Sequence, residues 1–186
     1  MIPVVIVHFG NQDYFQKVIE ITSKKNTIFL IGDDMNKNIK NVRHIHYKEL
    51  MTDDLLELSK NFLDFKADKC IEVLSDLRCN NNEKYDFLRY ARVFFMRELM
   101  MREKIPWIFH IDSDCVLLED VNTIDILKQE TVILSKPFLT LEMDMIASIH
   151  NSLLNLEFCE KFIEMVSDTF IKKNIAHKMM EKYFGI

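Results

Sequence analysis

Glycine and proline are scarce in this chain, with 3 of each in 186 residues. A turn-rich β-sandwich needs such residues roughly every 8 to 12 positions, so their scarcity favours long helices between a few strands. Hydrophobic residues make up 48% of the chain, which is enough for an ordinary buried core and excludes general disorder. At roughly 150 residues per domain, the length predicts one domain over residues 1–186.

The chain also lacks an excess of basic residues. It carries 24 Lys and Arg against 29 Asp and Glu, and the net charge of −5 repels a phosphate backbone. It has no run of about 18 apolar residues, which a membrane-spanning helix requires. The opening MIPVVIVHFG has no basic leader, unlike a secretion signal. We therefore expect no nucleic-acid partner, no membrane span and a cytoplasmic location.

The cysteines lack the spacing of a zinc site or a disulfide framework. Cys70, Cys79, Cys115 and Cys159 include no C-x-x-C pair and lie mostly among apolar neighbours. This pattern predicts reduced, buried thiols. Cys115 is next to acidic residues, whose charge raises the pKa of its thiol and argues against a nucleophilic role.

Apolar runs alternate with helical stripes along the chain. The runs predict strands at residues 4–7, 27–31, 42–47, 107–111 and 131–134, with a weaker strand around 146–149. The stripes predict helices at residues 13–24, 83–104 and 156–171, and across 52–77 either two short helices or one bent helix. This order predicts an α/β fold with a mostly parallel, Rossmann-like sheet flanked by helices, and ligands at the carboxyl ends of its strands.

One tripeptide stands out from this background. The apolar strand WIFHI runs directly into Asp112, Ser113 and Asp114. Residues two apart on a strand project from one face, roughly 6.5 Å apart, and a bend at the strand end brings their carboxylates together. Two converging carboxylates suit Mg²⁺ or Mn²⁺, which take oxygen ligands and keep positions open for substrate phosphates. The pattern thus predicts a metal site at Asp112 and Asp114 and a nucleotide-diphosphate substrate.

Simpler interpretations of this tripeptide stay open. A D-x-D in an acidic chain also arises by chance or from an aspartate that caps a turn. Two carboxylates about 6 Å apart repel each other by roughly 3 kcal/mol at an effective dielectric near 20. Either a metal ion or an arginine between them would offset this repulsion. His110 shares the strand face of Asp112 and Asp114, but a histidine inside an apolar strand is more often a core residue than a ligand.

The stretch FLRYARVFFMRELMMREKIPWIFHIDSDCVLLEDV resembles the middle of a GT-A-fold, nucleotide-sugar-dependent glycosyltransferase, where a helix bearing arginine precedes a strand that runs into D-x-D. VIVHFGNQDYF followed by IFLIGDD is similar to the first two, nucleotide-contacting strands of that family. SIHNSLLNLEFCEKFIEMV resembles its strand-to-helix segment downstream of D-x-D, and the resemblance covers most of residues 2–170. The resemblance implies a GT-A fold. It also implies transfer of a sugar from a nucleotide-diphosphate donor to an acceptor on a glycan, protein or lipid, with a UDP-sugar as the favoured donor.

Carried over residue by residue, the resemblance implies specific roles. Asp114 would bind Mn²⁺ or Mg²⁺ directly, Asp112 would bind the metal or the ribose, and Ser113 would lie near the sugar nucleotide. Arg89 would help to hold the donor, with a structural ion pair to Asp112 as its alternative role. The remaining residues implied to contact the nucleotide are His8, Phe9, Gly32 and Asp33 at the first two strands, and Arg92 on the helix face of Arg89.

The implied reaction expels a nucleoside diphosphate when an acceptor hydroxyl attacks the anomeric carbon, and a bound cation supplies the counter-charge. An inverting reaction needs a carboxylate or a histidine to take the acceptor proton, and Glu142, Asp144 and His150 are candidates by position. Members of the family usually continue past this length and often carry a late metal-binding histidine, for which His177 is the candidate. We expect either a minimal enzyme or a donor-binding core with a reduced acceptor-binding part after about residue 135.

Two other functions remain as alternatives. Haloacid-dehalogenase-like phosphatases also use a strand that ends in D-x-D, and Gly32-Asp33 imitates their G-D-x-x-x-D motif. In that family the D-x-D comes first, whereas here Gly32 precedes Asp112 by 80 residues. The order therefore argues against this class. A non-catalytic domain that binds a sugar nucleotide is the second alternative.

Overall fold

The computed structural model describes residues 1–64, 82–128, 131–135 and 148–170. The strands are β1 (Val4–Val7), β2 (Ile28–Gly32), β3 (Arg43–His46), β4 (Trp107–His110), β5 (Ile133–Ser135) and β6 (Ser148–Asn155). The α-helices are α1 (Phe15–Thr22), α2 (Asp53–Asp64), α3 (Asn82–Glu103) and α4 (Leu156–Phe170). Three short 3-10 helices, η1 (Tyr47–Leu50), η2 (Val121–Thr123) and η3 (Asp125–Lys128), complete the described elements.

The six strands form one sheet in the order β3-β2-β1-β4-β6-β5. β3, β2, β1 and β4 run parallel, whereas β6 runs antiparallel to both of its neighbours. The predicted α/β class and the mostly parallel sheet are therefore confirmed, with one antiparallel strand that the sequence pattern did not predict. Within the part of the chain that the structure describes, no helix is long and apolar enough to cross a bilayer.

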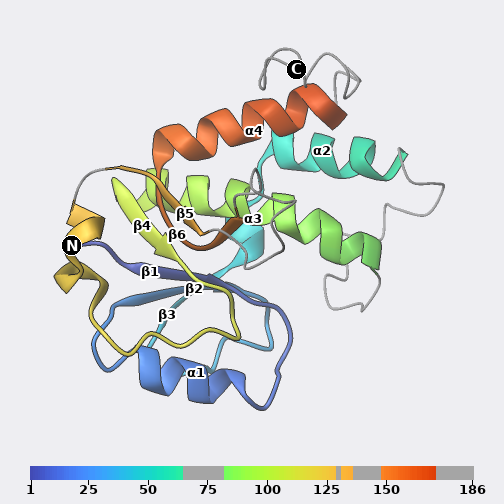
Figure 1. The fold of residues 1–186 in the computed structure, drawn as a ribbon. Coiled ribbons are helices and arrows are strands. Elements are labelled where there is room, and N and C mark those ends of the chain that lie inside the picture. The colour runs from blue at the N-terminus through green and yellow to red at the C-terminus, as the bar shows by residue number, and fades with distance from the viewer. Residues whose placement is uncertain (65–81, 129–130, 136–147, 171–186) are drawn as a thin grey trace, which may run out of the picture.

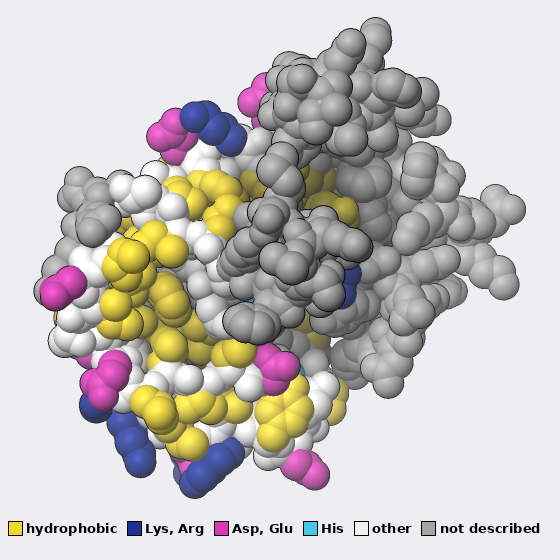
Figure 2. Space-filling model, in the orientation of Figure 1, with side chains coloured by type: hydrophobic (Ala, Val, Ile, Leu, Met, Phe, Trp, Pro, Cys, Tyr) yellow, Lys and Arg dark blue, Asp and Glu magenta, His cyan; other side chains and the backbone are white. Residues whose placement is uncertain are grey.

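The two faces of the sheet are covered by different helices (Figure 1). Alternate residues of β1 point to opposite faces, so Val4 and Ile6 pack toward α1, whereas Val5 packs into the cluster that contains α2, α3 and α4. The chain after β4 covers the α1 face as well, since Leu117 packs inward there and Leu118 is exposed. On the side shown in Figure 2, apolar side chains gather on the left half, and charged ones lie mainly along its left and lower edges. Because helices cover both faces of a mostly parallel sheet, the fold is doubly wound.

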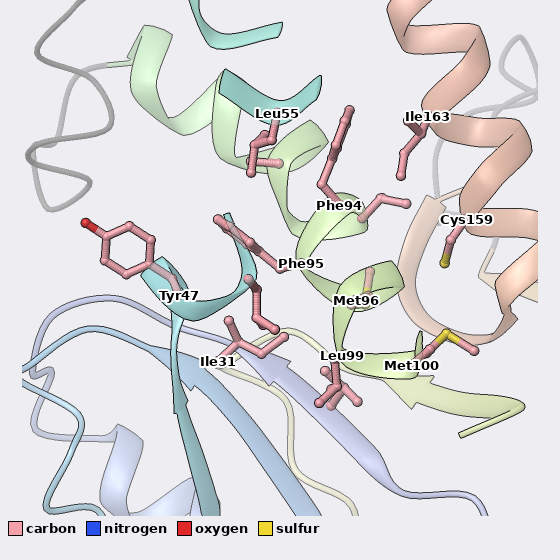
Figure 3. Packing of buried hydrophobic residues seen from close by; sticks show 14 of the residues in the cluster. Ile31, Tyr47, Leu55, Phe94, Phe95, Met96, Leu99, Met100, Cys159 and Ile163 are labelled. Atoms are coloured by element: carbon pink, nitrogen blue, oxygen red, sulfur yellow. The ribbon is translucent and has the colours of Figure 1, made fainter. Parts of the chain in front are cut away.

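Helix α3 is enclosed on most sides and forms the centre of the larger core. Figure 3 shows Phe94, Phe95 and Leu99 of α3 between Ile31 of the sheet and the side chains of α2 and α4. Val93 and Met96, outside the apolar stripe predicted on this helix, are also fully buried. A helix that is apolar on several sides packs against neighbours on several sides. The core therefore holds the α3 backbone in a fixed place.

Strand β6 is the element that the sequence predicted least well. We expected a weak strand around residues 146–149, but β6 extends to Asn155 and pairs along the whole of β4. Polar Ser, His and Asn residues interrupt its apolar pattern, and Ser152, Leu153 and Leu154 are fully buried. Apart from α2, the other strands and α-helices begin and end within two residues of the predicted bounds, whereas the three 3-10 helices were not predicted. The later part of the helix predicted across residues 52–77 lies outside the described residues.

Candidate functional site

The strand order reverses direction between β1 and β4. The connection from β1 leads through α1 to β2 on one side, whereas β4 lies on the other side of β1. In an open α/β sheet, such a reversal leaves a crevice at the carboxyl ends of the two strands, where ligands bind. Phe9 follows β1 and Asp112 follows β4, so the D-x-D segment lies at this point of the fold.

Asp112 and His150 come together through the register of β4 and β6. His110 is paired with Ser152 in this antiparallel ladder, so two residues further along the strand direction Asp112 lies opposite His150. Residues that face each other across strands project on the same side of the sheet. His150 Nδ1 contacts Asp112 Oδ2, and the histidine side chain is 40% exposed.

Arg92 approaches Asp112 from helix α3. Its Nη1 donates to Asp112 Oδ1 at 2.9 Å, and the two side chains are 12% and 24% exposed. The sequence had left an ion pair with Asp112 open for Arg89, but Arg92 makes it. Arg89 lies exposed one turn earlier on α3, and its implied contact with the donor stays a prediction. Charge-assisted bonds of this kind are roughly twice as strong as neutral ones, so Asp112 is firmly held.

His110 lies beneath Asp112 and is 1% exposed. Its Nδ1 is 3.0 Å from the carbonyl oxygen of Val5, which only accepts, so Nδ1 carries the hydrogen. Burial lowers the pKa of His110 to about 4, and the nearby charge of Arg92 acts in the same direction. The ring is therefore neutral at pH 7 and Nε2 is an acceptor. Nε2 lies 3.7 Å from Asp112 Oδ1 and has no hydrogen-bond partner among the described residues.

Asp114 differs from Asp112 in its surroundings. It is exposed, and its carboxylate Oδ1 lies 3.7 Å from the Cys115 sulfur. Burial raises the pKa of the Cys115 thiol, and the charges of Asp114 and Asp112 raise it further. A hydrogen bond from Asn151 acts in the opposite direction and lowers this pKa. The cysteine is thus a poor nucleophile at neutral pH, as its acidic neighbours predicted. Ser113 lies half-buried between the two aspartates.

The donor set fits a hard dication in part. Across the described ranges, no three His, Cys, Asp or Glu side chains are arranged to hold a metal ion. Asp114 offers an exposed carboxylate, whereas both oxygens of Asp112 contact protein groups. The buried Nε2 of His110 is a further acceptor beside Asp112 Oδ1. A dication here would take its remaining ligands from a diphosphate and water, as Mg²⁺ commonly does.

Gly32 ends β2, and Asp33 begins the loop that follows it. The Asp33 carboxylate is 9% exposed and accepts from the backbone N–H of Gly10 at 3.1 Å and of Met35 at 2.9 Å. The fully buried Asn36 accepts from the Asp33 N–H at 3.0 Å and donates to the Gly10 carbonyl. A Cβ on Gly32 would overlap the Asn36 side chain. Both residues therefore have structural roles here, and their implied contacts with the base and ribose stay predictions.

His8 and Phe9 lie on opposite faces of the sheet. His8 stacks on Phe15 of α1 with ring centroids 3.8 Å apart, and burial lowers its pKa to about 4. Phe9 lies 5.4 Å from Tyr47 and 6.4 Å from Phe95 of α3, measured between ring centroids. Of these two residues, only Phe9 therefore shares the face of Arg92. The contact of His8 with a nucleotide stays a prediction.

The geometry brings together residues that the sequence had treated separately. Arg92, Asp112 and His150 converge, and His110 lies below them. The sequence missed this convergence because it depends on the antiparallel pairing of β6. The predicted candidates Glu142, Asp144 and His177 lie outside the described residues, as do Cys70 and Cys79.

Comparison with known proteins adds no family to this description. No protein-family model matches the chain, and no curated protein or solved structure is significantly similar to it. The functional argument therefore depends on the fold and on the side chains around Asp112.

Proposed function

We propose that this chain is a glycosyltransferase that moves a sugar from a nucleotide-diphosphate donor to an acceptor hydroxyl. The observation that carries the proposal is the D-x-D segment at the carboxyl end of β4, beside the reversal of strand order, with Arg92 and His150 in contact with Asp112. A nucleotide-binding crevice, two acidic side chains and a guanidinium are what the binding of a metal-diphosphate requires.

Arg92 and Asp114 are the residues that we assign to the diphosphate end of the donor. Asp114 is the exposed carboxylate at which Mn²⁺ or Mg²⁺ would be held together with the phosphate oxygens. When bound, the cation supplies a counter-charge for the departing nucleoside diphosphate. Arg92 adds a second positive charge close by, with planar donors that match phosphate oxygens. Ser113 lies between the two aspartates, where a hydroxyl can donate to the donor sugar or phosphate.

His150 is the described residue best suited to accept the proton of the acceptor hydroxyl. Asp112 contacts its Nδ1, and a carboxylate at that position favours the tautomer in which Nε2 is the basic nitrogen. A partly exposed imidazole held in this way can take a proton at Nε2. Asp144 remains the alternative base from the sequence, outside the described residues.

Calorimetric titration with UDP-, GDP- and dTDP-sugars, with and without Mn²⁺, tests the proposal. We expect one donor class to bind only with the metal, and Asp114→Ala to abolish that binding. The matched control is Glu119→Ala, which removes an exposed acid from the same segment. Binding of a sugar nucleotide without donor hydrolysis or transfer would indicate a non-catalytic domain. Hydrolysis of a simple phosphomonoester that is lost in Asp112→Asn would indicate a phosphohydrolase.

A further inference from the structure

Oδ1 of Asp112 is an acceptor that Arg92 and a divalent cation would both need. We propose that Arg92 exchanges with a divalent cation at Asp112. In the ligand-free site Arg92 holds Asp112, and it leaves Oδ1 when a dication binds that oxygen. Arg92 then binds the diphosphate that arrives with the cation. The identity of the incoming anion rests on the proposed function. The competition between Arg92 and a cation for Asp112 does not depend on it.

The contact between Arg92 and Asp112 places a dication in competition with the guanidinium. Nη1 lies 2.9 Å from Oδ1, and Oδ2 is occupied by contact with His150 Nδ1. A dication bound to Oδ1 would therefore share a single oxygen with a guanidinium, and like charges at such a distance repel strongly in a partly buried site. Because the core encloses α3, the arginine side chain has to move instead of the helix.

His110 is the second observation, and it favours the cation-bound arrangement. Its Nε2 is a buried acceptor beside Oδ1 that lacks a hydrogen-bond partner within the described ranges. An acceptor buried without a partner carries a free-energy cost, and native proteins leave few such groups. With Arg92 on Oδ1, this nitrogen stays unsatisfied at 3.7 Å from the carboxylate. A hard cation at Oδ1 would be next to the lone pair and offset that cost.

Competition of this kind has reciprocal consequences. If Arg92 competes with a cation for Asp112, then removal of its charge raises the affinity of Asp112 for the cation. A diphosphate offers Arg92 a new anionic partner, so it helps the cation to bind in the wild-type protein. The same diphosphate helps the cation less when Arg92 is absent. Arg92 thus links the binding of the cation to the binding of the nucleotide.

Mn²⁺ is titrated into the protein without nucleotide, and electron paramagnetic resonance measures the free and bound Mn²⁺. This titration measures the competition directly. We expect Arg92→Gln to bind Mn²⁺ about 10-fold more tightly than the wild type, a usual size for coupling between two sites. The control Arg102→Gln changes another arginine of α3, which pairs with Glu49 at the surface, and should leave the affinity unchanged. The gain should disappear in the double variant Arg92→Gln/Asp112→Asn. With Mn²⁺ saturating, Arg92→Gln should bind UDP about 10-fold more weakly than the wild type.

Equal or weaker Mn²⁺ binding by Arg92→Gln would overturn the exchange. A gain in Mn²⁺ affinity without binding of any nucleotide would support the competition and refute the proposed function, so the two failures are distinguishable. If Arg92→Gln does not fold, a wild-type crystal soaked with Mn²⁺ and UDP gives the answer. The exchange predicts that Arg92 Nη1 leaves hydrogen-bond distance of Asp112 Oδ1 and contacts the diphosphate. Mn²⁺ bound with the Arg92–Asp112 pair still intact would refute it.

Discussion

The backbone N–H of Gly10 donates to Oδ2 of Asp33 at 3.1 Å and joins the loops that follow β1 and β2. The other Asp33 oxygen accepts from the Met35 N–H, so both carboxylate oxygens stabilise backbone groups. These two loops follow the carboxyl ends of parallel strands, at the same edge of the sheet as Asp112. A buried acid thus joins two loops at the edge of the sheet where the candidate site lies.

Asp33→Asn is expected to lower the free energy of unfolding by about 1–3 kcal/mol, because an amide turns a donor toward one of two backbone N–H groups. Urea denaturation of the purified variant measures this loss. The control is Asp34→Asn, which changes the neighbouring, largely exposed carboxylate. If both variants lose the same stability, the proposed role of Asp33 in joining the loops is wrong.

Gly32→Ala is expected to cost about 1–3 kcal/mol, since its Cβ would overlap the buried Asn36 side chain. Asn36 cannot move freely because it bonds Gly10 and Asp33. Adding Asn36→Ala should make the combined loss smaller than the sum of the two single losses, since the clash is then removed. Thermal or urea unfolding of the three variants measures the coupling. Fully additive losses would contradict the proposed overlap.

The low pKa of His8 predicts a pH dependence of stability. The unfolded chain binds a proton at His8 below its ordinary pKa of 6.5, whereas the folded chain does so only near 4. Stability from this residue is therefore fully present above pH 6.5 and falls as the pH decreases toward 4. His8→Phe keeps a ring against Phe15. It should reduce the slope of the free energy of unfolding against pH by up to about 1.4 kcal/mol per pH unit. Unfolding curves between pH 4 and 7 that have the same slope in both proteins would refute the assignment.

Much of the fold follows from apolar periodicity. The continuous runs of β1 and β2 are buried on both faces, as central parallel strands require, and their positions were predicted within one residue. The prediction of β6 was incomplete because its pairing with β4 buries the polar residue Ser152, and no local pattern shows such long-range pairing. Tertiary contacts, not local preference, determine strands of this kind.

The candidate site was predictable only in part. D-x-D at the end of a buried strand is visible in the sequence, and its location at the reversal of strand order follows from the fold. The sequence offered Arg89 as an alternative partner of Asp112, whereas Arg92 makes the contact. Arg89 and Arg92 share a helix face, and only the packing of α3 determines which one reaches the strand. The structural role of Asp33 was also missed, since a turn acid and a ligand acid look alike in sequence.

Asp112 and Asp114 should respond differently to the same change. Asp112→Asn removes the anionic partner of the mostly buried Arg92, so we expect a loss of about 1.5–3 kcal/mol in the free energy of unfolding. Asp114→Asn changes an exposed carboxylate and should alter stability by less than about 0.5 kcal/mol. Urea denaturation of both variants gives the comparison. Similar losses for both would contradict the division of roles between the two aspartates.

The central claim is that this chain transfers sugars from nucleotide-diphosphate donors. The most direct test measures the release of free nucleoside diphosphate from a panel of sugar nucleotides in the presence of Mn²⁺, with chromatography as the detection method. We predict release from one donor class by the wild type and by Glu119→Ala, and none by Asp114→Ala. No release from any donor, together with no metal-dependent binding of any nucleotide, would contradict the claim.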